Sequence, residues 1–312
     1  MKLKIKKETA FAAYRQTLCE ADVQRLAAFF TEYEGRVTLP RSDRGKMRAD
    51  FENAILYYAS IGLSLTDALS RLDLENLGGF YARPPMLWYA LDDAAKVYPI
   101  SMQHGRMAVF RLSVYFKDPV VPALLQMALT FVIRRFPSFS TSVRKGFFWH
   151  YLDTSKQRYF VQPETDIPCR PLKISKSGSP SFRVLYYNNR VSVEFFHILT
   201  DATGGMVFLK TLTAAYLRLL GAPACKGDGV LDCGEIPAAE ETINAFPRVE
   251  RTANASGFVD GPAVQLGGKL SRRRPCRVLH FKMDAGQLKQ AARNRNAKVT
   301  AYILSLMSVA SR

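Results

Sequence analysis

The sequence has no long apolar run, no clustered cysteines and few histidines. No stretch reaches the roughly 18 uninterrupted apolar residues that a membrane helix requires. The cysteines form no C-x-x-C pair and have no histidine at a zinc-ligand interval, so reduced and mostly structural thiols are expected: Cys19, Cys169, Cys225, Cys233 and Cys276. No internal repeat is visible. These absences predict a globular protein with neither a membrane span nor a metal site.

What the sequence does contain is enough apolar material for a large core and an excess of positive charge. Its 312 residues are long enough for two ordinary domains, and 48% of them are hydrophobic. The opening segment MKLKIKKETAF is basic with no apolar run behind it, so the chain is expected to be uncleaved and cytoplasmic. The net charge of +17 attracts phosphates on a nucleic acid, a lipid or a phosphorylated cofactor, and does not choose among them.

Residues 1–85 are predicted to form a helical N-terminal extension or small module. Apolar residues recur at three-to-four spacing in 21–33 and again in 50–63. Ser64 or Thr66 is placed to cap a further short helix before the loop NLGGFYARPP.

From residue 106 the apolar period changes to two, which predicts a strand over 106–116 with one fully apolar face. Asp118 is predicted to cap the next helix, with Pro119 at its first position and Pro137 ending it. Two further strands are expected near 147–151 and 158–161.

Residues 181–197 are predicted to form a β-hairpin that turns at Asn188-Asn189, because asparagine tolerates the positive φ of such turns. Counting outwards from the turn gives the facing pairs Tyr187–Arg190, Val184–Val193, Arg183–Glu194 and Phe182–Phe195. Two apolar pairs and an oppositely charged pair match in one register, which supports the hairpin.

The remainder predicts helices separated by a long loop. A buried helix is expected over 205–220, a long crossover or partly mobile loop over 222–275, a strand over 276–283, and helices over 285–294 and 299–310. The last helix stops at the final residues, so the sequence is expected to be cut short. The predicted class is α+β, with a mixed sheet packed by helices over residues 86–285, the helical extension before it, and the start of a truncated second half over 286–312.

His197, in the stretch FFHILTDATGG, is the candidate functional residue. The strand 191–196 delivers it to a strand end, a common catalytic position, and a short turn leads through Gly204-Gly205 into the apolar helix. The alternative is a core histidine, with Asp201 only an N-cap of the helix, and the spacing leaves both open. No role is given to His104, His150 and His280.

These residues resemble the H-x-x-x-D-G motif of the chloramphenicol acetyltransferase superfamily, which includes peptide-synthetase condensation domains and alcohol acetyltransferases. The element order is similar too, and RFPSFSTSVRKGFFWHYL is similar to the family's P-x-L-R-T segment. The resemblance covers residues 86–312 and is closest to bacterial alcohol acetyltransferase-like proteins. Ala202 and Ser140 stand where the family has glycine and arginine. The D-F-G-W-G segment is absent, so little more than one half of the family's α/β sandwich is expected.

The resemblance implies transfer of an acyl group from acyl-CoA, a co-substrate and not a bound cofactor, to the hydroxyl of a small alcohol. It makes His197 the general base, and Gly204 and Gly205 structural residues of the motif. It also implies that Asp201 holds the turn through an ion pair with an arginine. The candidates are Arg144, Arg183 and Arg106, of which Arg144 is favoured. The candidate contacts to coenzyme A phosphates, with solvated faces as the alternative, are Arg272-Arg273-Arg274 and Lys289 to Lys298.

Two other functions compete with this one. A condensation enzyme that takes its acyl group from a carrier protein is disfavoured by Phe196, which stands where such enzymes have a second histidine. A non-catalytic basic module that binds nucleic acid is disfavoured because the aromatic residues lie in apolar strand patterns, which offer no exposed stacking platform.

Overall fold

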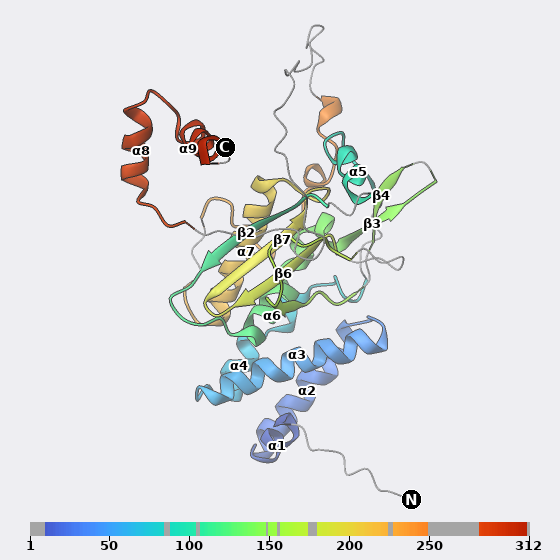
Figure 1. The fold of residues 1–312 in the computed structure, drawn as a ribbon. Coiled ribbons are helices and arrows are strands. Elements are labelled where there is room, and N and C mark those ends of the chain that lie inside the picture. The colour runs from blue at the N-terminus through green and yellow to red at the C-terminus, as the bar shows by residue number, and fades with distance from the viewer. Residues whose placement is uncertain are drawn as a thin grey trace, which may run out of the picture. The chain divides into compact units, whose positions relative to one another are not determined.

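The computed structural model describes residues 10–83, 88–103, 107–147, 149–154, 157–173, 180–223, 227–248 and 281–310 (Figure 1). The chain divides into two compact units, Met1–Val249 and Glu250–Arg312. Within the described ranges, no helix is both long enough and apolar enough to cross a membrane.

The first unit contains two β-sheets. The larger has the strand order β2-β7-β6-β5, formed by Val109–Tyr115, Arg190–Phe196, Phe182–Tyr187 and Val161–Pro163. Its β5 runs parallel to β6 while the other pairs are antiparallel, so the sheet is mixed. The smaller, antiparallel sheet has the order β1-β4-β3, formed by Trp88–Ala90, His150–Thr154 and Thr141–Lys145. The predicted α+β class with a mixed sheet is confirmed.

Two apolar helices pack against each other and against the larger sheet: α6 (Pro122–Val132) and α7 (Ala202–Leu219). The alternation of β7 sends Val191, Val193 and Phe195 into the core that these helices share with the sheet. The next residue, Phe196, enters a second, smaller core on the other side. Consecutive phenylalanines of one strand therefore belong to two different cores.

The register of the β6–β7 hairpin is as predicted. Its facing pairs are Tyr187↔Arg190, Val184↔Val193, Arg183↔Glu194 and Phe182↔Phe195. Asn188 has a φ of 48°, the left-handed conformation that asparagine tolerates in two-residue turns.

The start of α6 differs from the prediction. The helix begins at Pro122, with Val121 as its N-cap, instead of at Pro119 with Asp118 as its cap. A residue before proline is disfavoured in helical conformation, so Val121 stays extended and the helix starts at the second of the two prolines. The backbone N–H of Val121 donates to the Tyr216 hydroxyl at 2.8 Å, which ties this start to α7.

Four helices precede the sheets: α1 (Ala10–Gln16), α2 (Glu20–Arg36), α3 (Arg41–Ser60) and α4 (Leu65–Arg71). Ser64, one of the two caps considered, accepts the Asp67 N–H at 3.1 Å. The helices do not stand apart as an extension, because their buried residues belong to the same core as α6 and α7. The hydroxyl of Tyr58 donates to the Leu219 carbonyl at 2.7 Å, and that of Tyr81 donates to the Thr130 carbonyl at 2.9 Å.

An ion pair between Asp50 and Arg158 joins α3 to the segment before β5. Arg158 donates through Nε and Nη2 to the two carboxylate oxygens, each at 2.6 Å. Burial raises the pKa of Asp50, and the hydrogen bonds and charge of Arg158 oppose this rise. The carboxylate therefore depends on its partner to stay ionised in the interior.

The second unit contains α8 (Ala285–Arg293) and α9 (Val299–Ala310) in its described residues, close to the predicted helices. Asp284 caps α8 by accepting the Gln287 N–H at 2.8 Å. The predicted strand 276–283 lies mostly outside the described residues, and its last three residues are not in a strand. The described part of the predicted long loop has two short 3-10 helices, Ala239–Glu241 and Phe246–Arg248.

We predict that Arg158→Met lowers the free energy of unfolding in urea by about 3 kcal/mol, because the Asp50 carboxylate stays buried without its partner. The matched control is Arg25→Met, which breaks an exposed pair with Asp22 and should cost less than about 1 kcal/mol. Equal losses in the two variants would contradict a structural role for the Asp50–Arg158 pair.

Candidate functional site

His197 is the first residue after β7, and three contacts fix its position. Its backbone N–H donates to the Ala108 carbonyl at 2.9 Å, which extends the β2–β7 ladder by one bond. The imidazole stacks on Tyr98 of α5 (Tyr98–Gln103), with ring centroids 4.6 Å apart and planes 11° from parallel. The ring of Phe110 on β2 also contacts the imidazole, with ring centroids 4.9 Å apart and planes tilted by 56°. The half-buried histidine thus contacts two aromatic side chains from elements that lie far from it in the sequence.

The turn after His197 ends in a capped helix. Asp201 is the N-cap of α7: its Oδ1 accepts the Gly204 N–H at 2.8 Å, and its carbonyl accepts the Gly205 N–H at 3.0 Å. A carboxylate here satisfies otherwise unpaired helix donors and lies at the positive end of the helix dipole. The helix therefore begins three residues earlier than the predicted 205, as the N-cap alternative for Asp201 requires.

The ion pair expected between Asp201 and an arginine is not formed by the described residues. The Nε of Arg144 lies 3.7 Å from Asp153 on the neighbouring strand β4. The Nε of Arg183 donates to Glu194 at 2.7 Å. Both arginines thus face a carboxylate on an adjacent strand. Arg106, the third candidate, lies outside the described residues.

Gly205 allows α7 to approach the sheet closely below His197. A Cβ added there would meet the Phe195 ring at 3.1 Å, Leu112 at 3.2 Å and Phe110 at 3.3 Å, all tighter than ordinary contact. A Cβ at Gly204 would overlap the Thr200 hydroxyl. The two glycines thus have a packing role in the turn and in the seat of α7.

The two departures from the motif that the sequence resembles have simple local explanations. Ala202 is the first residue of α7 and does not have a positive φ, so no glycine is needed there. Ser140 is buried, and its hydroxyl donates to the Pro137 carbonyl at 2.7 Å. Ser140 therefore completes a local turn in the position of the family's arginine.

The face of the larger sheet opposite α6 and α7 carries a row of charges, only part of which the sequence predicts. Arg111, Glu194 and Arg183 face one another across β2, β7 and β6. Glu194 is 0% exposed and also accepts the Cys169 N–H at 2.8 Å. The hairpin register predicts the Arg183–Glu194 pair, whereas the alternation of strand 106–116 does not show that Arg111 faces Glu194.

Glu164 extends this row through ion pairs with Arg111 and Arg190. Burial raises the pKa of Glu164, but hydrogen bonds and charges from both arginines outweigh burial, so the pKa lies below its usual value of 4.5. Glu164 therefore stays ionised at neutral pH and attaches the chain after β5 to the sheet.

Of the other histidine and basic candidates, His150 lies among the described residues of the first unit. His150 faces Lys145 across the β3–β4 pair, and burial and the Lys145 charge lower its pKa. His104, His280 and Arg272-Arg273-Arg274 lie outside the described residues. Lys289 lies on α8 of the second unit and Lys298 just before α9. Among the residues that the structure describes, no group of three or more His, Cys, Asp or Glu side chains is placed to hold a metal ion.

No family model and no curated protein matches the chain. Among solved structures, it is similar to the starter condensation domain of the rhizomide synthetase RzmA, at 14% identity over 46% of this chain and 40% of that chain, with a TM-score of 0.36. The first condensation domain of the calcium-dependent antibiotic synthetase is 13% identical over 45% and 40%, with a TM-score of 0.35. The X-domain from teicoplanin biosynthesis is 18% identical over 49% and 37%, with a TM-score of 0.35.

The chain thus spans between 37% and 40% of the length of these three structures. TM-scores this low assign neither a family nor an activity to this chain.

We predict that Asp201→Ala lowers the free energy of unfolding by about 1 kcal/mol, because α7 loses the acceptor for its Gly204 N–H. Asp201→Asn keeps an acceptor oxygen and should cost less than about 0.5 kcal/mol. Urea unfolding of both variants measures the difference. Equal losses would mean that the negative charge, and not the cap, is what the turn requires.

The direction of the Glu164 pKa shift predicts how the free energy of unfolding depends on pH. Because that pKa is lowered in the folded state, its contribution is present above about pH 4.5 and is lost as the pH falls through the folded pKa. Glu164→Gln should therefore lose most stability at pH 7 and little at low pH, measured by urea unfolding across that range. Arg111→Met, which removes one partner, should flatten the profile in part. A constant difference between wild type and Glu164→Gln would contradict this.

Proposed function

We propose that the chain carries the general base of an acyltransferase that moves an acyl group from a coenzyme A thioester to the hydroxyl of a small alcohol. The observation that carries the proposal is the setting of His197: a strand-end imidazole oriented by two aromatic rings and followed by a turn that Asp201 caps. This arrangement suits the H-x-x-x-D-G motif that the sequence resembles.

The chemistry needs a base at this position. An alcohol is a weak nucleophile until a base removes its proton, and histidine is the side chain most often used for this step. The imidazole of His197 accepts the hydroxyl proton while the alcohol oxygen forms a bond to the thioester carbonyl carbon. The tetrahedral intermediate then breaks its carbon–sulfur bond, and the leaving thiolate takes the proton from the imidazolium. The products are an ester and free coenzyme A.

The neighbours of His197 have positioning roles in this proposal. Tyr98 and Phe110 restrict the rotation of the ring, which keeps one nitrogen aimed in a fixed direction. Asp201 holds the turn by capping α7 and takes no part in the proton transfer. Gly205 sets how closely α7 approaches the strand that ends at the histidine.

The carrier-protein-dependent alternative is less well supported by the same site. Phe196 stands at the position of the second histidine of such enzymes, and its side chain is fully buried in the smaller core. It has a packing role there and presents no second polar group beside His197. The acyl donor is therefore proposed to be a coenzyme A thioester, which also suits the net charge of +17.

The test is thiol release by the full-length protein from acetyl-, butyryl- and octanoyl-CoA with a panel of primary alcohols. We expect His197→Ala to lower kcat by about 10²- to 10⁴-fold, the range for loss of a general base. His150→Ala is the matched control, and it should keep wild-type activity because His150 is the first residue of β4, where it faces Lys145 and not His197. Activity that survives His197→Ala would overturn the proposal, as would thiol release at the background rate with every pair of substrates.

A further inference from the structure

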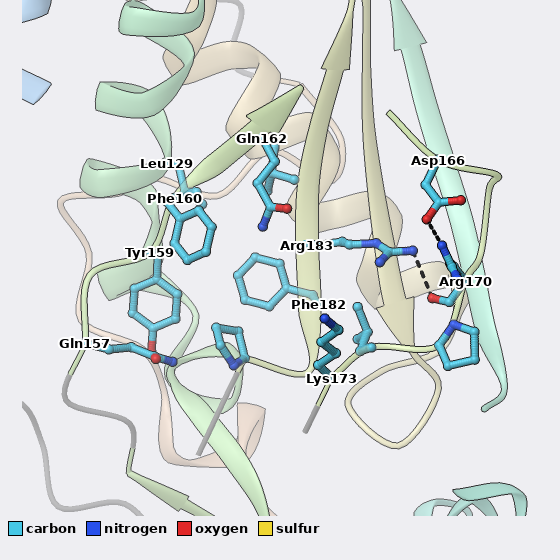
Figure 2. Close-up of a pocket in the computed structure, with 14 residues that line it drawn as sticks. Leu129, Gln157, Tyr159, Phe160, Gln162, Asp166, Arg170, Lys173, Phe182 and Arg183 are labelled. Carbon is cyan, nitrogen blue, oxygen red and sulfur yellow. Dashed lines mark hydrogen bonds and ion pairs between the residues drawn. The ribbon is translucent and has the colours of Figure 1, made fainter. Parts of the chain in front are cut away.

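A cavity of about 590 Å³ lies beside β5 and β6, and His197 is not part of its lining. We propose that this cavity, named here the β6 cavity, binds a small carboxylate with a flat apolar body. Its volume falls in the range of roughly 300 to 1,000 Å³ typical of small-molecule sites. Figure 2 shows aromatic rings gathered on one side of it and the Arg183, Arg170 and Asp166 side chains on the other.

The wall that carries the rings is rigidly held from α6. Buried Gln126 donates its amide N–H to the Tyr159 carbonyl at 2.9 Å, and its amide oxygen accepts the Val161 N–H at 3.0 Å. Arg158, the residue before Tyr159, forms the ion pair with Asp50. The backbone on both sides of Phe160 is thus fixed before any ligand binds.

Phe160 supplies most of the apolar ring surface that the lining exposes. Tyr159 and Phe182 stack with centroids 6.1 Å apart and planes 10° from parallel. Phe160 is 47% exposed although it lines the cavity, whereas Tyr159 and Phe182 are 2% and 5% exposed, and Leu129 and Val184 are buried. Offset or edge contacts with such rings favour a planar apolar molecule over a fully polar one.

Of the charged side chains in the lining, the Lys173 ammonium is the one proposed to bind the ligand. Arg170 is paired with Asp166. Arg183 donates to the Glu194 carboxylate at 2.7 Å and to the Arg170 carbonyl at 2.8 Å. Lys173 has no ion pair with any residue that the structure describes. Because both guanidinium groups already have carboxylate or carbonyl partners, the lining suits a single negative charge better than a phosphate with several.

Two amides add the hydrogen bonds that a carboxylate needs. The side-chain nitrogen of Gln157 is buried and has no hydrogen-bond partner in the described part of the chain. A buried donor without a partner is costly, so it marks a position where an acceptor oxygen would be stabilised. The Gln162 amide also faces this space, and it makes no hydrogen bond to the described residues (Figure 2).

Together these groups define the ligand as a carboxylate that Lys173 and Gln157 bind, attached to a planar body that lies on Phe160. The probe for the test is trans-cinnamate, and cinnamamide is the matched compound that has the same body without the charge. Isothermal titration of the full-length protein should show binding of cinnamate and at least about tenfold weaker binding of the amide.

Two variants test the assignment of the contacts. We expect Lys173→Met and Gln157→Leu each to weaken cinnamate binding by about tenfold or more. Lys117→Met, which removes an exposed lysine outside the lining, is the matched control and should bind as wild type does. Thermal unfolding shows whether each variant is folded. No binding of cinnamate to the wild type, equal binding of the amide, or full affinity in folded Lys173→Met would each overturn the proposal.

The inference does not depend on the acyltransferase proposal. His197→Ala should bind cinnamate with wild-type affinity, whether or not it has lost thiol release. Loss of cinnamate binding in that variant would show that the β6 cavity is not a separate site.

Discussion

The close approach of α7 to the larger sheet at Gly205 is the constraint on which the surroundings of His197 depend. With no Cβ, this residue lets the helix lie against Phe195, Phe110 and Leu112. The same Phe110 contacts the imidazole, and the same helix begins at the cap that closes the turn. Strand end, turn and helix start are therefore set by one packing contact, since interiors are packed too tightly for such elements to shift independently.

Local patterns in the sequence were sufficient for the elements whose contacts are close in sequence. The hairpin register followed from Asn188 and a count of residues, and Ser64 marked the start of α4. The start of α6 was predicted wrongly because Pro119 and Pro122 can each be the first residue of a helix. In the structure the helix starts at Pro122, where the Val121 N–H donates to the Tyr216 hydroxyl. Short-range rules fix a turn or a cap when one pattern dominates, and they leave the choice open when two patterns compete.

Contacts between distant segments could not be predicted. Nothing in the pattern around residue 98 identified Tyr98 as the ring that stacks on His197, and Arg144 was expected to pair with Asp201 while Asp153 lay on the next strand. The β6 cavity was missed as well, since its lining is assembled from α6, the chain around β5 and β6. A single sequence indicates which residue types a site contains. Which arginine pairs with which carboxylate depends on the fold.

The bonds that Tyr58 and Tyr81 donate have a practical consequence for dividing the chain. Leu219 ends α7, so the Tyr58 hydroxyl satisfies one of the carbonyls that every helix leaves unpaired at its C-terminal end. The Tyr81 hydroxyl donates in the same way to the carbonyl of Thr130 in the last turn of α6. A fragment that starts after residue 85 would expose these carbonyls and the apolar side of α6 together, so the shortest self-sufficient piece of this protein includes its N-terminal helices.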